Sequence, residues 1–237
     1  MGYWRTLHLF DDKKFYKEVV PELKGEIGDL TQSCLEFLKY YTTGGISHLS
    51  TEKLNSLVEQ NIQRIISISN SLDETFKIHH EFHKITNYDS QNLFLSSLDG
   101  HYEFCKFLEY YLFKTCADFN PHLGLGKGGI SRNFNIHIKT LSYNIIEELD
   151  DWNDFLSQDS MGITNWITNE DIQFLFLDKE NLHFEDNDLA KAFLTLLDIA
   201  HKNKLGFIMG VDMRESELEL LSKNKLLVND LYSHKPE

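Results

Sequence analysis

The chain has 237 residues, of which 41% are hydrophobic and 13% aromatic, enough apolar material to build a sizeable core and to exclude an intrinsically disordered protein. Its formal net charge of −14 excludes nonspecific nucleic-acid binding and docking on anionic lipid, because both need a basic surface. No stretch approaches the roughly 18 apolar residues of a membrane span, and the sequence shows no secretory signal. The three cysteines lack Cys-x-x-Cys spacing. We therefore expect a cytoplasmic protein with reduced thiols.

Helical periodicity dominates the first half of the chain, although Tyr3 to Phe10 can form a short strand. One apolar stripe follows a possible cap at Asp29, and Asp73 and Asp99 can cap two later helices. The expected core positions are Leu30, Cys34, Phe37, Leu38 and Tyr41, then Leu54, Leu57, Val58, Ile62, Ile65 and Leu72, then Phe104, Leu108, Tyr111 and Leu112.

Three histidines, His79, His80 and His83, lie close together before the middle of the chain. In a helix His79 and His83 stand one turn apart, a spacing that zinc or nickel sites use. No nearby motif supplies the remaining ligands, and surface or partly buried histidines are common without metal. We therefore predict neither a metal nor another cofactor.

A glycine-rich segment at 120–130 holds four glycines within six residues, where no regular element is expected to persist. No Pro-rich or Ser-rich linker and no internal repeat marks a second domain. We therefore predict one helical domain over 1–237, with this loop between two helical halves.

The hexamer that follows the loop, Arg132-Asn133-Phe134-Asn135-Ile136-His137, resembles the Arg-polar-x-x-x-His signature of the HEPN ribonuclease superfamily of small helical proteins. The resemblance implies metal-independent RNA cleavage, with His137 moving a proton, Arg132 holding the scissile phosphate and Asn133 positioning one or the other. A structural Arg/His pair is the competing interpretation, and the acidic stretch downstream would repel RNA.

From Thr140 to Asp178 the chain carries nine carboxylates and neither lysine nor arginine. Ile145, Leu149, Trp152 and Leu156 repeat at helical spacing, which turns the acids toward an exposed ridge. A ridge of one sign beside aromatic side chains is typical of a surface that binds a basic protein. The predicted partner-binding residues are Glu147, Glu148, Asp150, Asp151, Asp154, Trp152, Trp166, Glu170 and Asp171. Alternatively, the aromatic residues are core and the acids merely face solvent.

Further helices are expected after this ridge. Thr168 with Asp171 can start one, 172–184 can form a helix or a hairpin, and Asp212 with Glu215 can cap a last helix. A strong apolar stripe begins at Asn187 and ends near Gly206. The predicted fold class is mainly α, a single-domain multi-helix bundle with at most a minor β element.

The general character of the chain, acidic and compact without a convincing active site, is similar to bacterial immunity proteins, which neutralise a cognate toxin. The opening Gly2-Tyr3-Trp4 that leads to Leu7-His8-Leu9-Phe10-Asp11 also resembles the start of such proteins. The resemblance implies stoichiometric inhibition of a cognate toxin, and so a binding protein more than an enzyme. The negative charge predicts that this toxin is basic and that the chain contacts neither a membrane nor nucleic acid directly. The alternative function is a HEPN-like ribonuclease.

Overall fold

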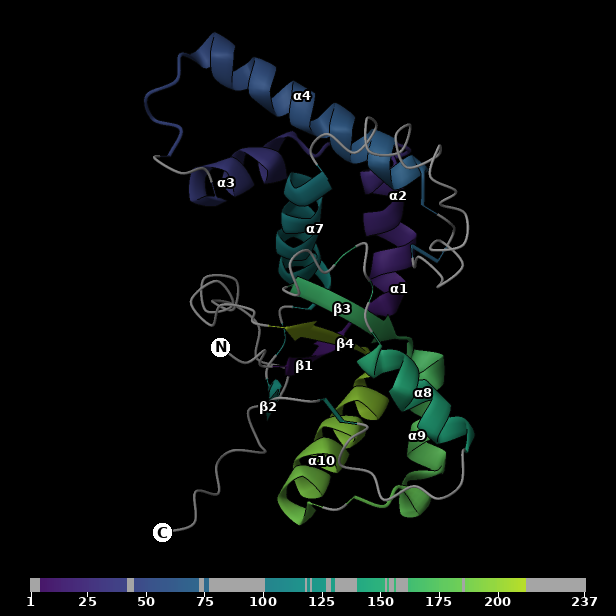
Figure 1. Ribbon diagram of the computed structural model, residues 1–237. Coiled ribbons are helices and arrows are strands. Elements are labelled where there is room, and N and C mark those ends of the chain that lie inside the picture. The colour runs from purple at the N-terminus through teal and green to yellow at the C-terminus, as the bar shows by residue number, and fades with distance from the viewer. Residues whose placement is uncertain are drawn as a thin grey trace, which may run out of the picture. The chain divides into compact units, whose positions relative to one another are not determined.

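The structure is a computed structural model that describes residues 5–41, 45–72, 75–76, 101–117, 119, 121–126, 129–130, 140–151, 153, 156, 162–184 and 186–211. Within these ranges most of the regular structure is helical, and one four-stranded antiparallel sheet is present (Figure 1). The expectation of a mainly helical chain is confirmed. The expectation of a bundle with at most a minor β element is corrected, because the sheet is an integral part of the core.

Contacts along the chain divide it into two compact units, one made of Met1–Lys13 with Phe113–Glu237 and the other of Lys14–Leu112. The division does not fall in the glycine-rich segment at 120–130. The single domain over 1–237 stays a prediction, because compact units need not fold independently of each other. None of the helices in the described ranges is long and apolar enough to cross a lipid bilayer.

The sheet of the first unit has the strand order β2-β1-β4-β3 with antiparallel neighbours. Its strands are β1 (Arg5–Phe10), β2 (Leu123–Gly126), β3 (Gly162–Ile167) and β4 (Gly206–Val211). The strand predicted near the N-terminus is confirmed as β1. The other three were not predicted, and β2 lies inside the segment where no regular element was expected.

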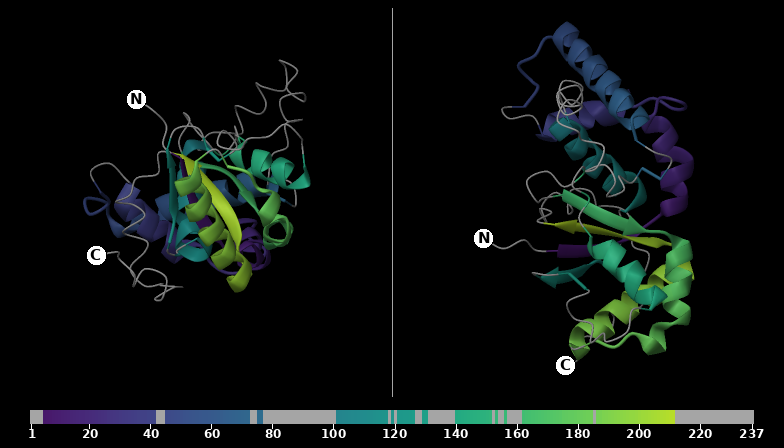
Figure 2. Two further views of the ribbon diagram at one scale, coloured as in Figure 1. Left: turned by 90° about the horizontal axis from the view of Figure 1, so that it is seen from below. Right: turned by 45° about the vertical axis from the view of Figure 1, so that its right-hand side comes forward.

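Three helices cover one face of this sheet: α8 (Leu141–Asp150), α9 (Asn169–Leu177) and α10 (Asn187–Asn203) (Figures 1 and 2). Alternate residues of β1 and β4 point toward the helices, as the two-residue period of a strand requires. The buried cluster between the two layers includes Leu7, Leu9, Phe207 and Met209 from the strands and Ile145, Ile146, Leu149, Ile172, Leu175, Phe193, Leu196 and Leu197 from the helices.

The opposite face of the sheet is also buried. His8, Ile208 and Trp166 are cross-strand neighbours on it, and the rings of Phe10 and Trp166 lie 6.2 Å apart between centroids. Because every residue of β4 is buried, its sequence is a continuous apolar run without polar alternation. Such a run does not distinguish a central strand from a buried helix segment, which explains why β4 was missed.

The second unit contains only helices among its described residues. Four helices lie wholly inside it: η1 (Phe15–Val19, a π-helix), α2 (Val20–Leu23), α3 (Thr31–Tyr41) and α4 (Thr51–Asn70). The short α1 (Asp12–Lys14) and the longer α7 (His101–Cys116) include residues of both units. The predicted cap at Asp29 is confirmed, since its Oδ1 accepts from the Thr31 amide at 2.9 Å. Phe37 packs edge-on against Phe107, with ring centroids 5.4 Å apart.

The open alternative at 172–184 is decided in favour of a helix, because α9 continues to Leu177 and a 3₁₀ turn, η3 (Lys179–Asn181), follows it. The helix that begins at Asn187 ends at Asn203 with Lys204 in the left-handed conformation. Gly206 begins β4 and does not cap the helix. A Cβ at Gly206 would lie 2.2 Å from the Ile167 carbonyl oxygen, so the close approach of β3 requires glycine there.

Candidate functional site

The acidic stretch from Thr140 to Asp178 does not fold into a uniformly exposed ridge. Among its described acids, Glu147, Glu148, Asp151 and Glu170 are exposed, and Asp171 and Asp178 are partly buried. We call the four exposed acids the acidic face. Asp150 is buried, whereas Asp154 and Trp152, two other predicted partner-binding residues, lie outside the described residues.

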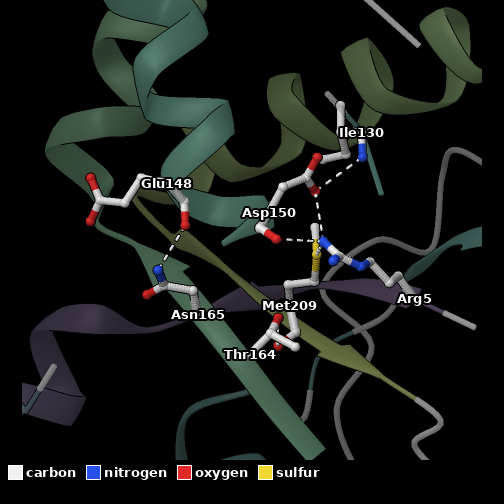
Figure 3. Close-up of polar contacts among 7 residues, drawn as sticks. All are labelled: Arg5, Ile130, Glu148, Asp150, Thr164, Asn165 and Met209. Carbon is white, nitrogen blue, oxygen red and sulfur yellow. Dashed lines mark hydrogen bonds and ion pairs between the residues drawn. The ribbon is translucent and has the colours of Figure 1, made fainter. Parts of the chain in front are cut away.

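Asp150 is held inside the first unit by three contacts to two residues from distant parts of the sequence, Arg5 and Ile130 (Figure 3). Its carboxylate Oδ1 lies 3.5 Å from Nη1 of Arg5 and accepts a hydrogen bond from the Ile130 amide at 3.0 Å. Its backbone carbonyl accepts from the same Arg5 nitrogen at 2.6 Å. The cation that compensates this acid therefore comes from β1, near the start of the chain.

The inward orientation of Asp150 follows from the helical repeat of α8. The buried positions of α8 are Ser142, Ile145, Ile146, Leu149 and Asp150, which recur at i, i+3, i+4, i+7 and i+8. Asp150 thus lies one turn after Ile146 on the core side. The prediction that Asp150 faces solvent is wrong. The prediction placed the buried side of the helix along Ile145 and Leu149 only, whereas the buried side also includes the neighbouring row of Ser142 and Ile146.

The carboxylate of Asp150 also fits closely against a turn of the glycine-rich segment. Gly129 has a φ of +75°, and a Cβ there would lie 2.5 Å from Oδ1 of Asp150. Only glycine allows both the left-handed backbone and this approach. Asp150 therefore connects β1, the turn at 129–130 and the end of α8, and its role is structural.

Trp166 is a core residue and is not available to a partner. It lies in β3 with an exposed fraction of 0%, so the alternative interpretation, that the aromatic residues are core, holds for this one. Asp171 has a structural task as well: its Oδ2 accepts from the Thr168 amide at 2.8 Å and completes the capping box that starts α9. The predicted helix start at Thr168 and Asp171 is confirmed.

The exposed residues of α8 and α9 include both acidic and apolar side chains. In α8 the exposed positions are Leu141, Asn144, Glu147 and Glu148, followed by Asp151 just beyond the helix. In α9 they are Glu170, Phe174 and Leu177, spaced at i, i+4 and i+7 along one side. Acidic and apolar groups are thus presented together on two neighbouring helices.

A hydrogen bond joins α8 to the end of α9. Ser142 donates from Oγ to Oδ2 of Asp178, and Asn181 donates from Nδ2 to Oδ1 of the same carboxylate at 2.6 Å. The bonds from Asn181 and Ser142 lower the pKa of Asp178 below its usual value, because both favour the charged form. Asp178 adds a further anion at this end of the two helices.

Three apolar residues of this surface, Leu141, Phe174 and Leu177, were not predicted as binding residues. The signal was the composition of α9, whose nine residues include five large apolar ones. One face of so short a helix buries only Ile172 and Leu175, so some apolar side chains have to point outward. The periodicity of core residues alone did not reveal which ones.

Two other features of the described residues offer no reactive group. A small cavity between α3, α4 and α7, lined by Cys34, Phe37 and Arg64 among others, has a volume of about 10 Å³, room for one water molecule. All three cysteines are free thiols, and burial raises the pKa of Cys34 to about 11 and that of Cys105 to about 12. Such thiols stay protonated near neutral pH and are poor nucleophiles.

The remaining predicted candidates lie outside the described residues: Arg132, Asn133 and His137 of the ribonuclease-like hexamer, and His79, His80 and His83. Within the described part of the chain no three His, Cys, Asp or Glu side chains gather as a metal site would need. What the described residues of α8 and α9 present to solvent is a surface of carboxylates and apolar side chains. Comparison with protein-family models, with curated proteins and with solved structures finds no match to this chain.

Proposed function

We propose that this protein neutralises a cognate toxin by binding it stoichiometrically, and that the acidic face of α8 and α9 meets a basic surface of that toxin. The observation that carries the proposal is the solvent exposure of Glu147, Glu148, Asp151 and Glu170 on two adjacent elements of one unit. A net charge of −14 adds a long-range field of the same sign.

The physical role of such a face is to accelerate encounter. Opposite charges steer two proteins together and raise the association rate, whereas rim charges contribute less to the lifetime of the complex. A toxin that acts on nucleic acid carries a basic surface to neutralise phosphates. An acidic protein that covers this surface competes directly with the toxin's substrate.

The burial of each acid decides which substitutions can test this proposal. Charge reversal at Asp150 would remove the partner of Arg5 inside the fold, so loss of binding could not be separated from unfolding. The informative triple variant is Glu147→Lys, Glu148→Lys and Glu170→Lys, whose wild-type side chains are exposed. Glu26→Lys, Glu52→Lys and Glu59→Lys, exposed positions of the second unit, form the matched control.

Both triple variants carry the same formal charge, since each Glu→Lys change adds two units and three changes take −14 to −8. The tagged full-length chain is used to capture proteins from its native cells at about 0.05 M and about 0.5 M salt, a range over which exposed charges become strongly screened. We expect the wild type and the control variant to retain a basic protein at low salt. We expect the α8–α9 variant to lose it.

The captured protein is then produced in a host cell with and without the full-length chain. Growth arrest by the captured protein alone, and rescue by the wild type but not by the α8–α9 variant, is the expected result. Binding that is indifferent to salt, or an equal loss in both triple variants, would show that the acidic face is not the docking surface. A captured protein that is harmless would contradict the toxin-neutralising function.

A further inference from the structure

Large exposed apolar side chains of the first unit are confined to one place among its described residues. They are Leu141, Phe174 and Leu177, with exposed fractions of 61%, 46% and 81%. All three belong to α8 and α9, the helices that carry the acidic face. Single exposed leucines are ordinary on a protein surface, but the concentration of three on two adjacent helices is not.

The three side chains lie at the same end of this helix pair. Leu141 directly precedes Ser142, and Leu177 directly precedes Asp178, and these two neighbours are hydrogen-bonded to each other. Phe174 stands three residues before Leu177, on the same side of α9. We call Leu141, Phe174 and Leu177 the apolar tip.

The core does not offer these side chains an alternative position. Ile172 and Leu175 occupy the buried side of α9, and Phe176 stacks on His201 with ring centroids 3.7 Å apart. The ammonium group of Lys179 lies 4.1 Å from the centre of the Phe176 ring. The side of α9 that carries Phe176 is therefore already occupied by His201 and Lys179. Phe174 and Leu177 are left pointing to solvent, where they lack the compensation of burial.

Carboxylates border the apolar tip. Asp178 adjoins Leu177, Glu170 lies one turn before Phe174 on the exposed side of α9, and Glu148 follows Leu141 by two turns along the exposed side of α8. These carboxylates outnumber Lys179, whose ammonium group is paired with Asp198. The mainly anionic surroundings disfavour a second copy of this chain, which carries the same charge of −14, and any anionic lipid surface. A cationic border on the partner complements it.

We infer that the apolar tip is the anchor of the complex and that it packs against apolar side chains bordered by lysines and arginines on the basic partner. This inference rests on the proposed function and deepens it by assigning two tasks to two sets of residues. The acidic face steers association, and the apolar tip, once desolvated, sets how long the complex lasts.

The test uses the full-length protein and three synthetic peptides of equal length as fluorescent probes. One peptide is oligolysine, one is an amphipathic helix with a leucine face between lysines, and one has the same leucine face between glutamates. We expect the leucine–lysine peptide to bind at least roughly tenfold more tightly than oligolysine, since tenfold corresponds to burial of about one apolar side chain. We expect no binding of the leucine–glutamate peptide.

The triple variant Leu141→Ser, Phe174→Ser and Leu177→Ser should abolish the preference for the leucine–lysine peptide and leave oligolysine binding unchanged. Ile27→Ser with Tyr102→Ser, exposed apolar residues of the second unit with exposed fractions of 48% and 50%, is the matched control and should keep the preference. Because all five side chains are exposed, circular dichroism and thermal unfolding should show an intact fold for both variants.

The outcomes separate the inference from the proposal on which it rests. Equal affinity for oligolysine and the leucine–lysine peptide overturns the anchor and leaves charge steering in place. Failure of oligolysine to bind the wild type at low salt contradicts the proposed basic partner, and a preference that survives the apolar-tip variant overturns the anchor. Sedimentation of the protein alone adds a last outcome: a dimer that the apolar-tip variant converts to monomers would show a self-interface and overturn the anchor as well.

Discussion

His8 is a buried histidine on the sheet face opposite α8, α9 and α10. Its Nε2 lies 2.9 Å from the Thr6 hydroxyl, and its ring stacks on His122 with centroids 5.2 Å apart and meets Phe113 edge-on at 5.0 Å. Burial, and then the charge of His122, lower the pKa of His8 from 6.5 to about 3. The folded chain therefore keeps this ring neutral at neutral pH and at moderately acid pH.

The lowered pKa of His8 makes stability depend on pH in a defined window. The unfolded chain binds a proton near pH 6.5 and the folded chain does not until about 3, so the neutral ring's contribution is full above about 6.5 and is lost as pH falls toward 3. Between pH 7 and pH 5 we expect His8→Gln to lose about 2 kcal/mol less stability than the wild type.

Urea unfolding at the two pH values measures this difference. The glutamine amide can still donate toward Thr6, and His122→Gln, at an exposed position of the same unit, is the control that should keep most of the wild-type pH response. An equal loss of stability in the wild type and in His8→Gln would show that His8 is not the group that titrates.

Two ion pairs of the first unit predict opposite responses to substitution. The Arg5–Asp150 pair, with side chains 12% and 7% exposed, is buried, whereas the Lys179–Asp198 pair, at 34% and 46%, faces solvent. Asp150→Ala removes the counter-charge of the largely buried Arg5 guanidinium and the acceptor of the Ile130 amide, although the backbone carbonyl at position 150 still accepts from Arg5. We expect the free energy of unfolding to fall by about 3 kcal/mol. Asp198→Ala should lower it by less than about 1 kcal/mol. Chemical denaturation measures both changes, and equal losses would mean that Arg5 and Asp150 do not form a buried pair.

At the scale of the elements, helix ends rather than helix centres decide where this chain turns. A capping box at Thr168 and Asp171 starts α9, and the carboxylate of Asp186 accepts from the Asp188 and Leu189 amides to start α10. The end of α10 is less favourable, because Lys204 takes a φ of +57°, a conformation in which a Cβ is crowded and glycine is not.

Replacing Lys204 by glycine should stabilise the protein. The change removes the crowding of the Cβ in the left-handed region and places the residue type that most often follows a helix, so we expect a gain of about 0.5 to 1 kcal/mol in the free energy of unfolding. Lys202→Gly, at an exposed position two residues earlier inside α10, should instead cost about 1 kcal/mol. Thermal unfolding of both variants checks the opposite signs, and a loss at Lys204 would contradict the strained cap.

At the scale of the whole molecule, the excess of negative charge acts against the compact state. The chain has 37 acidic and 23 basic side chains. The unbalanced negative charges repel one another more strongly when the chain is folded than when it is extended. Sodium chloride screens this repulsion over about 10 Å at 0.1 M, whereas the buried Arg5–Asp150 pair is little affected.

Raising sodium chloride from about 0.02 M to about 0.2 M should therefore increase the stability of the free protein. The gain should be smaller for the Glu26→Lys, Glu52→Lys and Glu59→Lys variant, which carries −8 instead of −14. Urea midpoints at several salt concentrations measure the effect. A fall in stability with salt would show that attractive pairs outweigh the repulsion.

The sequence by itself determined much of the helical structure. The apolar stripes of α3, α4, α7 and α10, the cap at Asp29, the helix start at Thr168 and the exposure of Glu147, Glu148, Asp151 and Glu170 all follow from local patterns. These features depend on residues three or four positions apart, so the information lies within a few turns of the chain.

Only the tertiary structure decided the sheet and which side chains belong to the proposed binding surface. β1 pairs with β4 across about two hundred residues of sequence, and no local pattern contains that pairing. The same long-range contacts bring Arg5 to Asp150, bury Trp166 and leave Leu141, Phe174 and Leu177 outside. A helical repeat shows which residues share a face, but which face is covered depends on what packs against it, and here those partners come from distant segments of the chain.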